Sequence, residues 1–135
     1  MTDAVRTDPA LLAVMFDAER ITALRHEVAR CAVSAGLNAQ RLEDFVLAVN
    51  EIVTNAVRHA GGRGRLRMWL AGAILRCEVV DHGGGIPADE DEGTMLPPSY
   101  AVSGRGLWLA RHLCDTLTVR SGPGGTTVTL ASAVA

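Results

Sequence analysis

The spacing of apolar side chains predicts two long amphipathic helices in the first half of the chain. Between residues 18 and 35 apolar positions recur every three or four residues, as one buried helical stripe requires. Asp17 is suited to cap this helix, and Gly36 supplies its stop. A second helix is predicted over 39–59, with Asn38 as its cap. Its core face would consist of Leu42, Phe45, Val46, Val49, Ile52, Val53, Ala56 and Val57.

Shorter stretches with a period of two predict strands. The apolar run 11–16 suits an edge strand, and the alternating segments 65–71 and 74–81 suit an antiparallel hairpin. Segments 116–121 and 126–131 alternate in the same way and are joined by a glycine-rich turn. The second half of the chain is therefore expected to contribute most of a sheet.

A third helix is predicted over 106–115, and the segment 82–103 is predicted to be a loop. Because helices and strands are mixed along the chain, we expect the α+β class. The expected architecture is a two-layer α/β sandwich, in which about three helices cover one face of a mixed, mostly antiparallel sheet. We expect one domain over 1–135, with residues 1–9 frayed.

Composition agrees with a single globular domain and excludes several classes of protein. The chain has 135 residues, of which 48% are hydrophobic, and no apolar run reaches the roughly 18 to 20 residues of a membrane span. The first residues also lack the layout of a signal peptide, so a cytoplasmic protein without membrane contacts is expected. A net charge of −2 gives no electrostatic reason to expect nucleic-acid binding. All 13 basic residues are arginine, which excludes a P-loop lysine, a Schiff-base lysine and pyridoxal phosphate chemistry.

Cysteine and histidine give no sign of a metal or redox site. Cys31, Cys77 and Cys114 are widely spaced, and they are interpreted as buried thiols. His26 and His112 lie within helical patterns, where a solvated or packed imidazole is the common outcome.

One polar stripe on the second predicted helix requires an explanation. Glu51, Asn55 and His59 follow one another at intervals of four residues, on a helix whose other faces are apolar. A solvent-facing edge would account for such a stripe in a helix that stood alone. Two glycine-rich segments further along the chain favour a ligand site instead.

The first of these segments is DHGGGIP, which begins at Asp81 at the end of a predicted strand. Its glycines permit close backbone approach to a ligand, and the carboxylate is able to accept a hydrogen bond from an exocyclic amine such as that of adenine. The second segment, 104–106, has the sequence GRG and opens the third helix, where unpaired amides and the positive end of the helix dipole suit phosphate. Taken alone, the first segment is more often a simple glycine-rich turn, and the second is more often an ordinary helix start.

In this order and at these separations, the three blocks resemble the N box and the two glycine boxes of the superfamily that contains gyrase, heat-shock chaperone, histidine kinase and mismatch-repair ATPases. The resemblance covers roughly residues 42–130, and GGTTVTL resembles the closing Thr-containing strand of that family. Within the superfamily, the phrases NEIVTNAVRHA and GRGLWLARHL look like the anti-sigma-factor serine kinases of sporulation and stress control.

The resemblance implies that the sandwich holds ATP together with Mg²⁺ under a lid. It implies that Asp81 binds the adenine amino group and that Asn55 supplies an oxygen ligand to Mg²⁺. Glu51 would be the general base or would position the attacking group, while Arg105 would neutralise phosphate charge and His59 would order the phosphate side. The other residues implied to contact the nucleotide are Gly83, Gly85, Ile86, Gly104, Gly106, Leu107 and either Thr126 or Thr127, of which the family pattern favours Thr126 slightly.

The lid implied by the resemblance covers residues 83–104, is short and carries the acidic run 89–92. The implied function is that of an anti-sigma factor that is also an ATP-dependent protein serine/threonine kinase and phosphorylates an anti-sigma-factor antagonist. Its partners would be a sigma factor and that antagonist. Two alternatives stay open, a non-catalytic ATP-binding regulatory module and a switch kinase that acts on a scaffold protein of a stress pathway.

A homodimer is also expected, because the strand at 11–16 has no obvious hairpin partner in the sequence. The alternative is that this strand joins the sheet of its own chain.

Overall fold

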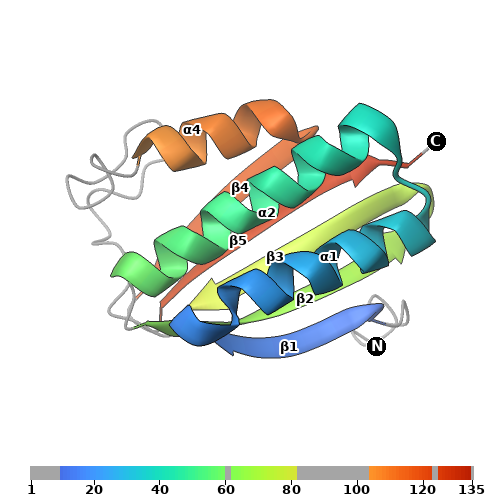
Figure 1. The fold of residues 1–135 in the computed structure, drawn as a ribbon. Coiled ribbons are helices and arrows are strands. Elements are labelled where there is room, and N and C mark those ends of the chain that lie inside the picture. Colours follow the sequence, from blue (N-terminus) through green and yellow to red (C-terminus); the bar gives the residue numbers. More distant parts are fainter. Residues whose placement is uncertain (1–9, 60–61, 82–103, 123–124, 135) are drawn as a thin grey trace, which may run out of the picture.

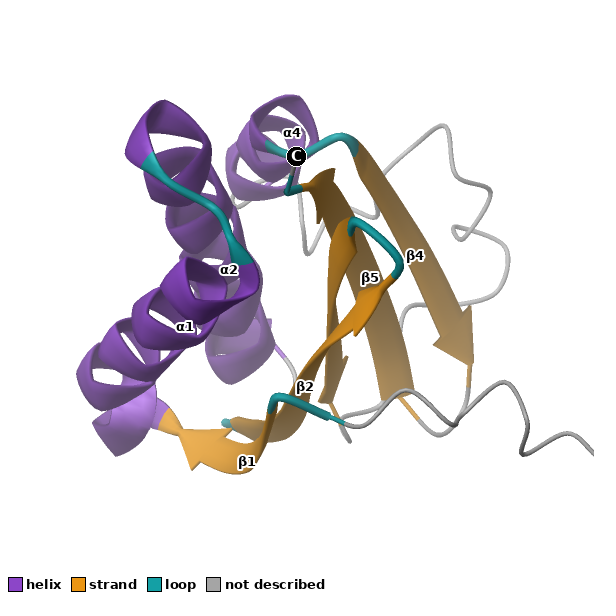
Figure 2. Ribbon diagram, turned by 90° about the vertical axis from the view of Figure 1, so that its right-hand side faces the viewer, coloured by secondary structure: helices purple, strands orange, loops and turns teal. Residues whose placement is uncertain are grey.

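A computed structural model describes residues 10–59, 62–81, 104–122 and 125–134. In these ranges the chain forms two layers, with the helices on one side of a single five-stranded sheet (Figures 1 and 2). The predicted α+β sandwich is confirmed. Residues 1–9, which were predicted to be frayed, and the predicted lid up to residue 103 lie outside the described ranges.

The sheet has the strand order β1-β2-β3-β5-β4, and each neighbouring pair is antiparallel. The expectation of a mixed sheet is thus wrong in detail, since none of the described strand pairs is parallel. The predicted hairpin is confirmed, because β2 pairs with β3 along its length. The strands are β1 (Leu12–Asp17), β2 (Arg63–Ala71), β3 (Ile74–Asp81), β4 (Thr116–Gly122) and β5 (Gly125–Ala133).

The N-terminal strand β1 joins the sheet of its own chain. It pairs with β2 in a register that places Met15 opposite Arg65, and it forms one edge of the sheet. The alternative considered for this strand is therefore the correct one. A missing strand partner no longer supports a homodimer.

The helices begin and end close to the predicted positions, with one difference. Asp17 accepts hydrogen bonds from the amides of Glu19 and Arg20, but it caps a short 3-10 helix, η2, rather than the long helix itself. Gly36 ends α1 as predicted, with a left-handed φ of 118° that a residue with a side chain rarely adopts. The helical elements are η2 (Ala18–Arg20), α1 (Ile21–Ala35), α2 (Ala39–His59) and α4 (Gly104–Leu113).

The core lies between α2 and the centre of the sheet. The predicted stripe of α2 is buried at Phe45, Val49, Ile52 and Val53, each at most 2% exposed. Burying each such side chain stabilises the fold by about 1.5–3 kcal/mol, so this stripe fixes the rotation of α2 about its axis. That rotation decides which polar residues of α2 face the sheet. The sheet side of the core is formed mainly by Leu66, Met68, Leu75, Cys77, Val79 and Leu130.

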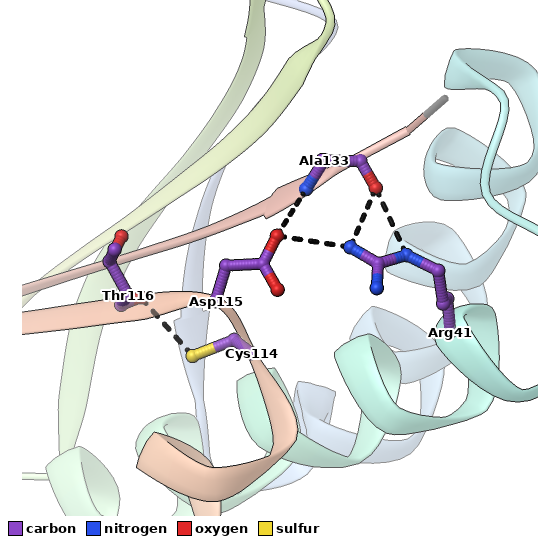
Figure 3. A network of polar contacts seen from close by, with 5 residues as sticks. All are labelled: Arg41, Cys114, Asp115, Thr116 and Ala133. Atoms are coloured by element: carbon purple, nitrogen blue, oxygen red, sulfur yellow. Dashed lines mark hydrogen bonds and ion pairs between the residues drawn. The ribbon is translucent and has the colours of Figure 1, made fainter.

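A polar network fixes the start of α2 against the far end of the sheet (Figure 3). The Arg41 guanidinium donates to the Asp115 carboxylate at 3.0 Å and to the Ala133 carbonyl at 2.9 and 3.1 Å. The Ala133 amide donates to the same carboxylate at 2.8 Å. These bonds hold the pKa of Asp115 below its ordinary value, chiefly through the Ala133 amide and then through Arg41. The network connects α2, the start of β4 and the end of β5.

All three cysteines are free thiols, but the prediction that all three are buried holds only for Cys77, since Cys31 and Cys114 are partly exposed. Cys77 is fully buried, and burial raises its pKa well above the ordinary value. Burial also raises the pKa of Cys31 and Cys114, so none of the three has the lowered pKa of a reactive cysteine. No helix in the described ranges is both long enough and apolar enough to span a lipid bilayer.

Candidate functional site

Helix α2 carries the first part of the site on the face that meets the sheet and α4. Asn55 is only 5% exposed although its side chain is polar, whereas Glu51, one turn earlier, is partly exposed. The Asn55 Nδ2 atom is buried and has no hydrogen-bond partner among the described residues. A buried amide without a partner costs about 1–3 kcal/mol, so this position favours a ligand that completes its hydrogen bonds.

Asp81 and Thr126 form the second part, where β3 and β5 lie side by side. Asp81 is 3% exposed, and its Oδ1 atom accepts a hydrogen bond of 3.1 Å from the Thr126 amide. The Thr126 hydroxyl lies 3.3 Å from the Ser121 hydroxyl. A Cβ atom at Gly125 would overlap the Asp81 carbonyl, and the φ of Gly125 is +132°. Only glycine allows this close approach, which brings the Thr126 amide to the Asp81 carboxylate.

The two threonines left open by the sequence lie on opposite faces of β5. Thr126 is 2% exposed and faces the helices, together with Val128 and Leu130. Thr127 pairs with Val80 and Arg120 on the face that points away from the helices. Of the two, only Thr126 is placed next to Asp81.

The first turn of α4 forms the third part. A Cβ atom built on Gly106 would lie 2.8 Å from Glu51 Oε1 and 3.6–3.7 Å from the side-chain amide of Asn55. Gly106 therefore lets the start of α4 pack directly against the polar stripe of α2. The structure thus brings the polar stripe of α2 next to the GRG motif at the start of α4, although the two are about 50 residues apart in the sequence.

Apolar side chains from the same elements line a small recess between Asn55 and Asp81, with a cavity volume of about 10 Å³. This volume holds about one water molecule, whereas ligand pockets usually have about 300–1,000 Å³, so the described residues line one wall of a ligand site and do not enclose a nucleotide by themselves. Leu107, which was predicted to contact the nucleotide, is 5% exposed and lines the recess. Four lining residues were not predicted from the sequence, although all four share a helix turn or strand face with predicted residues. These four are Ile52, Ala56, Val79 and Val128.

Several predicted site residues lie outside what the structure describes. Gly83, Gly85 and Ile86 fall between β3 and α4, in the part of the chain that is not described. The backbones of His59, Gly104 and Arg105 belong to α2 and α4, but the side chains of His59 and Arg105 are not described. Their predicted roles stay predictions.

The arrangement combines a buried hydrogen-bond acceptor, apolar walls and a polar mouth. The buried Asp81 carboxylate suits an exocyclic amine, and the apolar side chains beside it suit a flat aromatic ring. The Asn55 amide and the Glu51 carboxylate lie beside the positive end of α4, where an anionic group such as phosphate is favoured. Within the described ranges no three His, Cys, Asp or Glu side chains form a metal-binding group. A metal held here would thus take most of its ligands from a bound phosphate and from water, as Mg²⁺ does.

Comparison with known proteins agrees with this geometry. Residues 14–132 match the family described as the histidine kinase-like ATPase domain. The serine-protein kinase RsbW of Bacillus subtilis is 29% identical over 120 residues, which cover 80% of this chain and 75% of the relative. The anti-sigma F factor of Pasteuria penetrans is 32% identical over 114 residues, which cover 74% of this chain and 76% of the relative.

Solved structures show the same fold. The RsbU and RsbW domains of a Mycobacterium tuberculosis protein match with a TM-score of 0.68 and 24% identity, over 93% of this chain and 32% of that one. The histidine kinase domain of a blue-light-activated kinase from Erythrobacter litoralis matches with a TM-score of 0.56 and 24% identity, over 81% of this chain and 64% of that one.

Proposed function

The chain belongs to the histidine kinase-like ATPase family, and we propose that it is an anti-sigma factor and an ATP-dependent protein serine/threonine kinase. The observation that carries the proposal is the contact between Glu51, Asn55 and the first turn of α4. This contact places a carboxylate, a buried amide and a phosphate-binding helix terminus within one cluster. The relatives named above, a serine-protein kinase and an anti-sigma F factor, support the same function.

Asp81 is proposed to select adenine. Its Oδ1 atom already accepts from the Thr126 amide, and the recess beside it is walled by apolar side chains. A carboxylate accepts hydrogen bonds readily and therefore favours the exocyclic amine of adenine over the carbonyl of guanine at the same place. Thr126 would hold Asp81 in position and line the pocket.

We assign the Mg²⁺ ligand to Asn55. The side-chain amide of Asn55 is buried, lacks a partner at Nδ2 and lies 3.6–3.7 Å from where a Cβ atom of Gly106 would be. Mg²⁺ takes oxygen ligands and keeps several waters, so one amide oxygen with phosphate oxygens fits its chemistry. When bound, the ion supplies positive charge that screens the negative phosphate oxygens.

Phosphotransfer would proceed by in-line attack of a serine hydroxyl on the γ-phosphorus of ATP. The new bond joins the serine oxygen to the γ-phosphorus, the bond between that phosphorus and the β,γ-bridging oxygen breaks, and ADP leaves. The proton of the serine hydroxyl passes to the Glu51 carboxylate. Arg105 and the α4 amides would stabilise the charge on the transferred group, and His59 would order the phosphate side.

The acceptor would be a serine or threonine of an anti-sigma-factor antagonist, and the second partner would be a sigma factor. The proposed kinase reaction uses ATP, and the second proposed partner is a sigma factor, so we place the protein in the cytoplasm.

We also propose a homodimer. The support is β1, an edge strand of the sheet. The apolar side chain of Met15 in this strand is 59% exposed, and that of Leu11, which directly precedes the strand, is 45% exposed. Light scattering at micromolar concentration should then give the mass of two chains.

Radiolabelled ATP and the purified antagonist test the kinase function. The parent protein should label the antagonist. Glu51→Ala should bind ATP nearly normally yet lose about 10²- to 10⁴-fold in rate, because a positioned base has been removed. Asn55→Ala should lose both affinity and rate. Absence of labelling by the parent would favour the non-catalytic ATP-binding module, and labelling of a scaffold protein in place of the antagonist would favour the switch kinase.

A further inference from the structure

The face of the sheet that points away from the helices carries five arginines. The three helices lie on one side of the sheet, and none of the described elements covers the other side (Figure 2). Buried and exposed residues alternate along β2 and β3, so the side chains on this outer face are known from the register. The five arginines of the outer face are Arg63, Arg65, Arg67, Arg76 and Arg120.

These arginines extend from β2 to β4, which is four of the five strands of the sheet. Arg65 pairs with Val80, Val80 with Thr127, and Thr127 with Arg120, so the two arginines occupy one row. Three strand steps separate them, which corresponds to about 14 Å. Along β2, alternate residues repeat the arginine at intervals of about 6.6–6.8 Å. The result is a broad two-dimensional array of positive charge.

The outer face is far more positive than the chain as a whole. It holds five of the 13 basic residues but, among its described residues, only Asp17 and Glu78 of the 15 acidic ones. The remainder of the protein is therefore acidic. This asymmetry is invisible in the net charge of −2, which gave only a reason not to expect nucleic-acid binding.

Two apolar residues of the outer face, Met15 and Trp69, are of types that are enriched at protein interfaces. Met15 is 59% exposed and lies opposite Arg65, and Trp69 is partly exposed. The Arg67 guanidinium stacks on the Trp69 ring at 4.7 Å and forms an ion pair of 3.7 Å with Glu78. Arginine, tryptophan and methionine are enriched at protein interfaces, where lysine is depleted. Stacking on an aromatic ring also restricts the orientation of an arginine that contacts a carboxylate.

We propose that the outer face binds the acidic surface of a partner protein. Asn55 and Asp81 lie between the helices and the opposite face of the sheet, so a protein on the outer face leaves the proposed ATP site uncovered. The interaction is therefore compatible with bound nucleotide. The inference rests on the charge, the register and the residue types of the outer face, and it is independent of the proposed kinase activity.

A nucleic acid is the less favoured occupant. Single-stranded nucleic acids are held by several aromatic side chains together with a positive groove, whereas Trp69 is the one aromatic residue that the described strands place on this face.

A peptide of alternating Glu and Thr residues is a suitable probe, because an extended strand presents its carboxylates at the spacing of the β2 arginines. Binding of the fluorescein-labelled peptide to the full chain is measured by anisotropy at low salt, beside a single-stranded oligonucleotide of equal charge. R65E/R120E should weaken peptide binding by about tenfold or more, and R65Q/R120Q should weaken it less. The control R30E/R111E makes the same change in charge at exposed arginines of α1 and α4 and should leave the affinity unchanged.

Saturating ATP should not alter the affinity for the peptide. Equal loss in the control variant would show a response to net charge and would overturn the proposal. Tighter binding of the oligonucleotide would assign the face to nucleic acid instead. Peptide binding that appears only after the run 89–92 is neutralised (D89N/E90Q/D91N/E92Q) would show that this chain occupies its own outer face, and it would overturn the proposal. Absence of peptide binding in every variant would also overturn it.

Discussion

Gly106→Ala is expected to leave the protein folded while it lowers the rate of phosphotransfer. Gly106 lies in the first turn of α4, where an added Cβ atom would be 2.8 Å from Glu51 Oε1. Ordinary van der Waals contact begins at 3.4 Å, so the carboxylate oxygen would have to retreat by about 0.6 Å. Because that oxygen is the end of a flexible side chain, it is the part that gives way.

The consequences for stability and for rate have opposite signs. Alanine in place of glycine in a helix stabilises by up to about 1 kcal/mol, so the free energy of unfolding should rise or stay constant. A misplacement of about 1 Å in a catalytic group costs about 10²-fold in rate, so a shift of about 0.6 Å should cost about 10- to 100-fold. ATP affinity should change little, because the Asn55 atoms lie at 3.6–3.7 Å from the added carbon, a distance of normal contact.

A double-mutant cycle separates this explanation from general damage. Thermal unfolding, ATP affinity by calorimetry and transfer of ³²P to the antagonist are measured for Gly106→Ala, Glu51→Ala and the double variant. If the alanine acts through Glu51, it should reduce the rate no further once the carboxylate is absent. Full activity of Gly106→Ala, or an equal additional loss in the Glu51→Ala background, would refute the reasoning.

Three further predictions concern the pocket and the polar network. Asp81→Asn should weaken ATP binding by about 1–3 kcal/mol, and calorimetry should find that the parent prefers ATP to GTP; equal affinities would contradict the adenine assignment. Thr126→Val should weaken ATP binding, whereas the matched variant Thr127→Val on the opposite face of β5 should not. Asp115→Asn should lower the free energy of unfolding by less than about 1 kcal/mol at neutral pH, because this carboxylate is half exposed. Folding lowers the pKa of Asp115, so its carboxylate stabilises the folded protein at pH values above its ordinary pKa near 4. This stabilisation is lost as the pH falls below that value. Urea unfolding should therefore show that the free energies of unfolding of Asp115→Asn and the parent converge at low pH.

Local patterns in the sequence were sufficient to predict most of the fold. The alternation in β2 and β3 and the apolar stripe of α2 are fixed by burial on one face, and burial is what the periodicity records. The first helix was predicted too long, because Asp17 caps a 3-10 turn and a cap looks the same in sequence for either helix type. The pairing of β1 with β2 joins segments about 50 residues apart, and no local signal records it.

The site was predicted less completely, because its geometry depends on contacts between elements. The role of Gly106 as the position that lets α4 approach Glu51 depends on how two helices pack, and the sequence records only a glycine. Likewise, the choice of Thr126 over Thr127 required the register of β5 against β3. The five arginines of the outer face were not predicted to form a group, because they come from three strands and because acidic residues elsewhere balance their charge.

The central claim is that ATP binds between α2 and the sheet with adenine on Asp81 and its phosphates at α4. A crystal structure of the protein with Mg²⁺ and a non-hydrolysable ATP analogue tests it most directly. The account predicts the adenine amine within hydrogen-bond distance of the Asp81 carboxylate, the Asn55 side-chain oxygen on the metal, and the Glu51 carboxylate facing the γ-phosphate. Adenine bound away from Asp81, or phosphates that leave Asn55 and α4 without contact, would contradict the account.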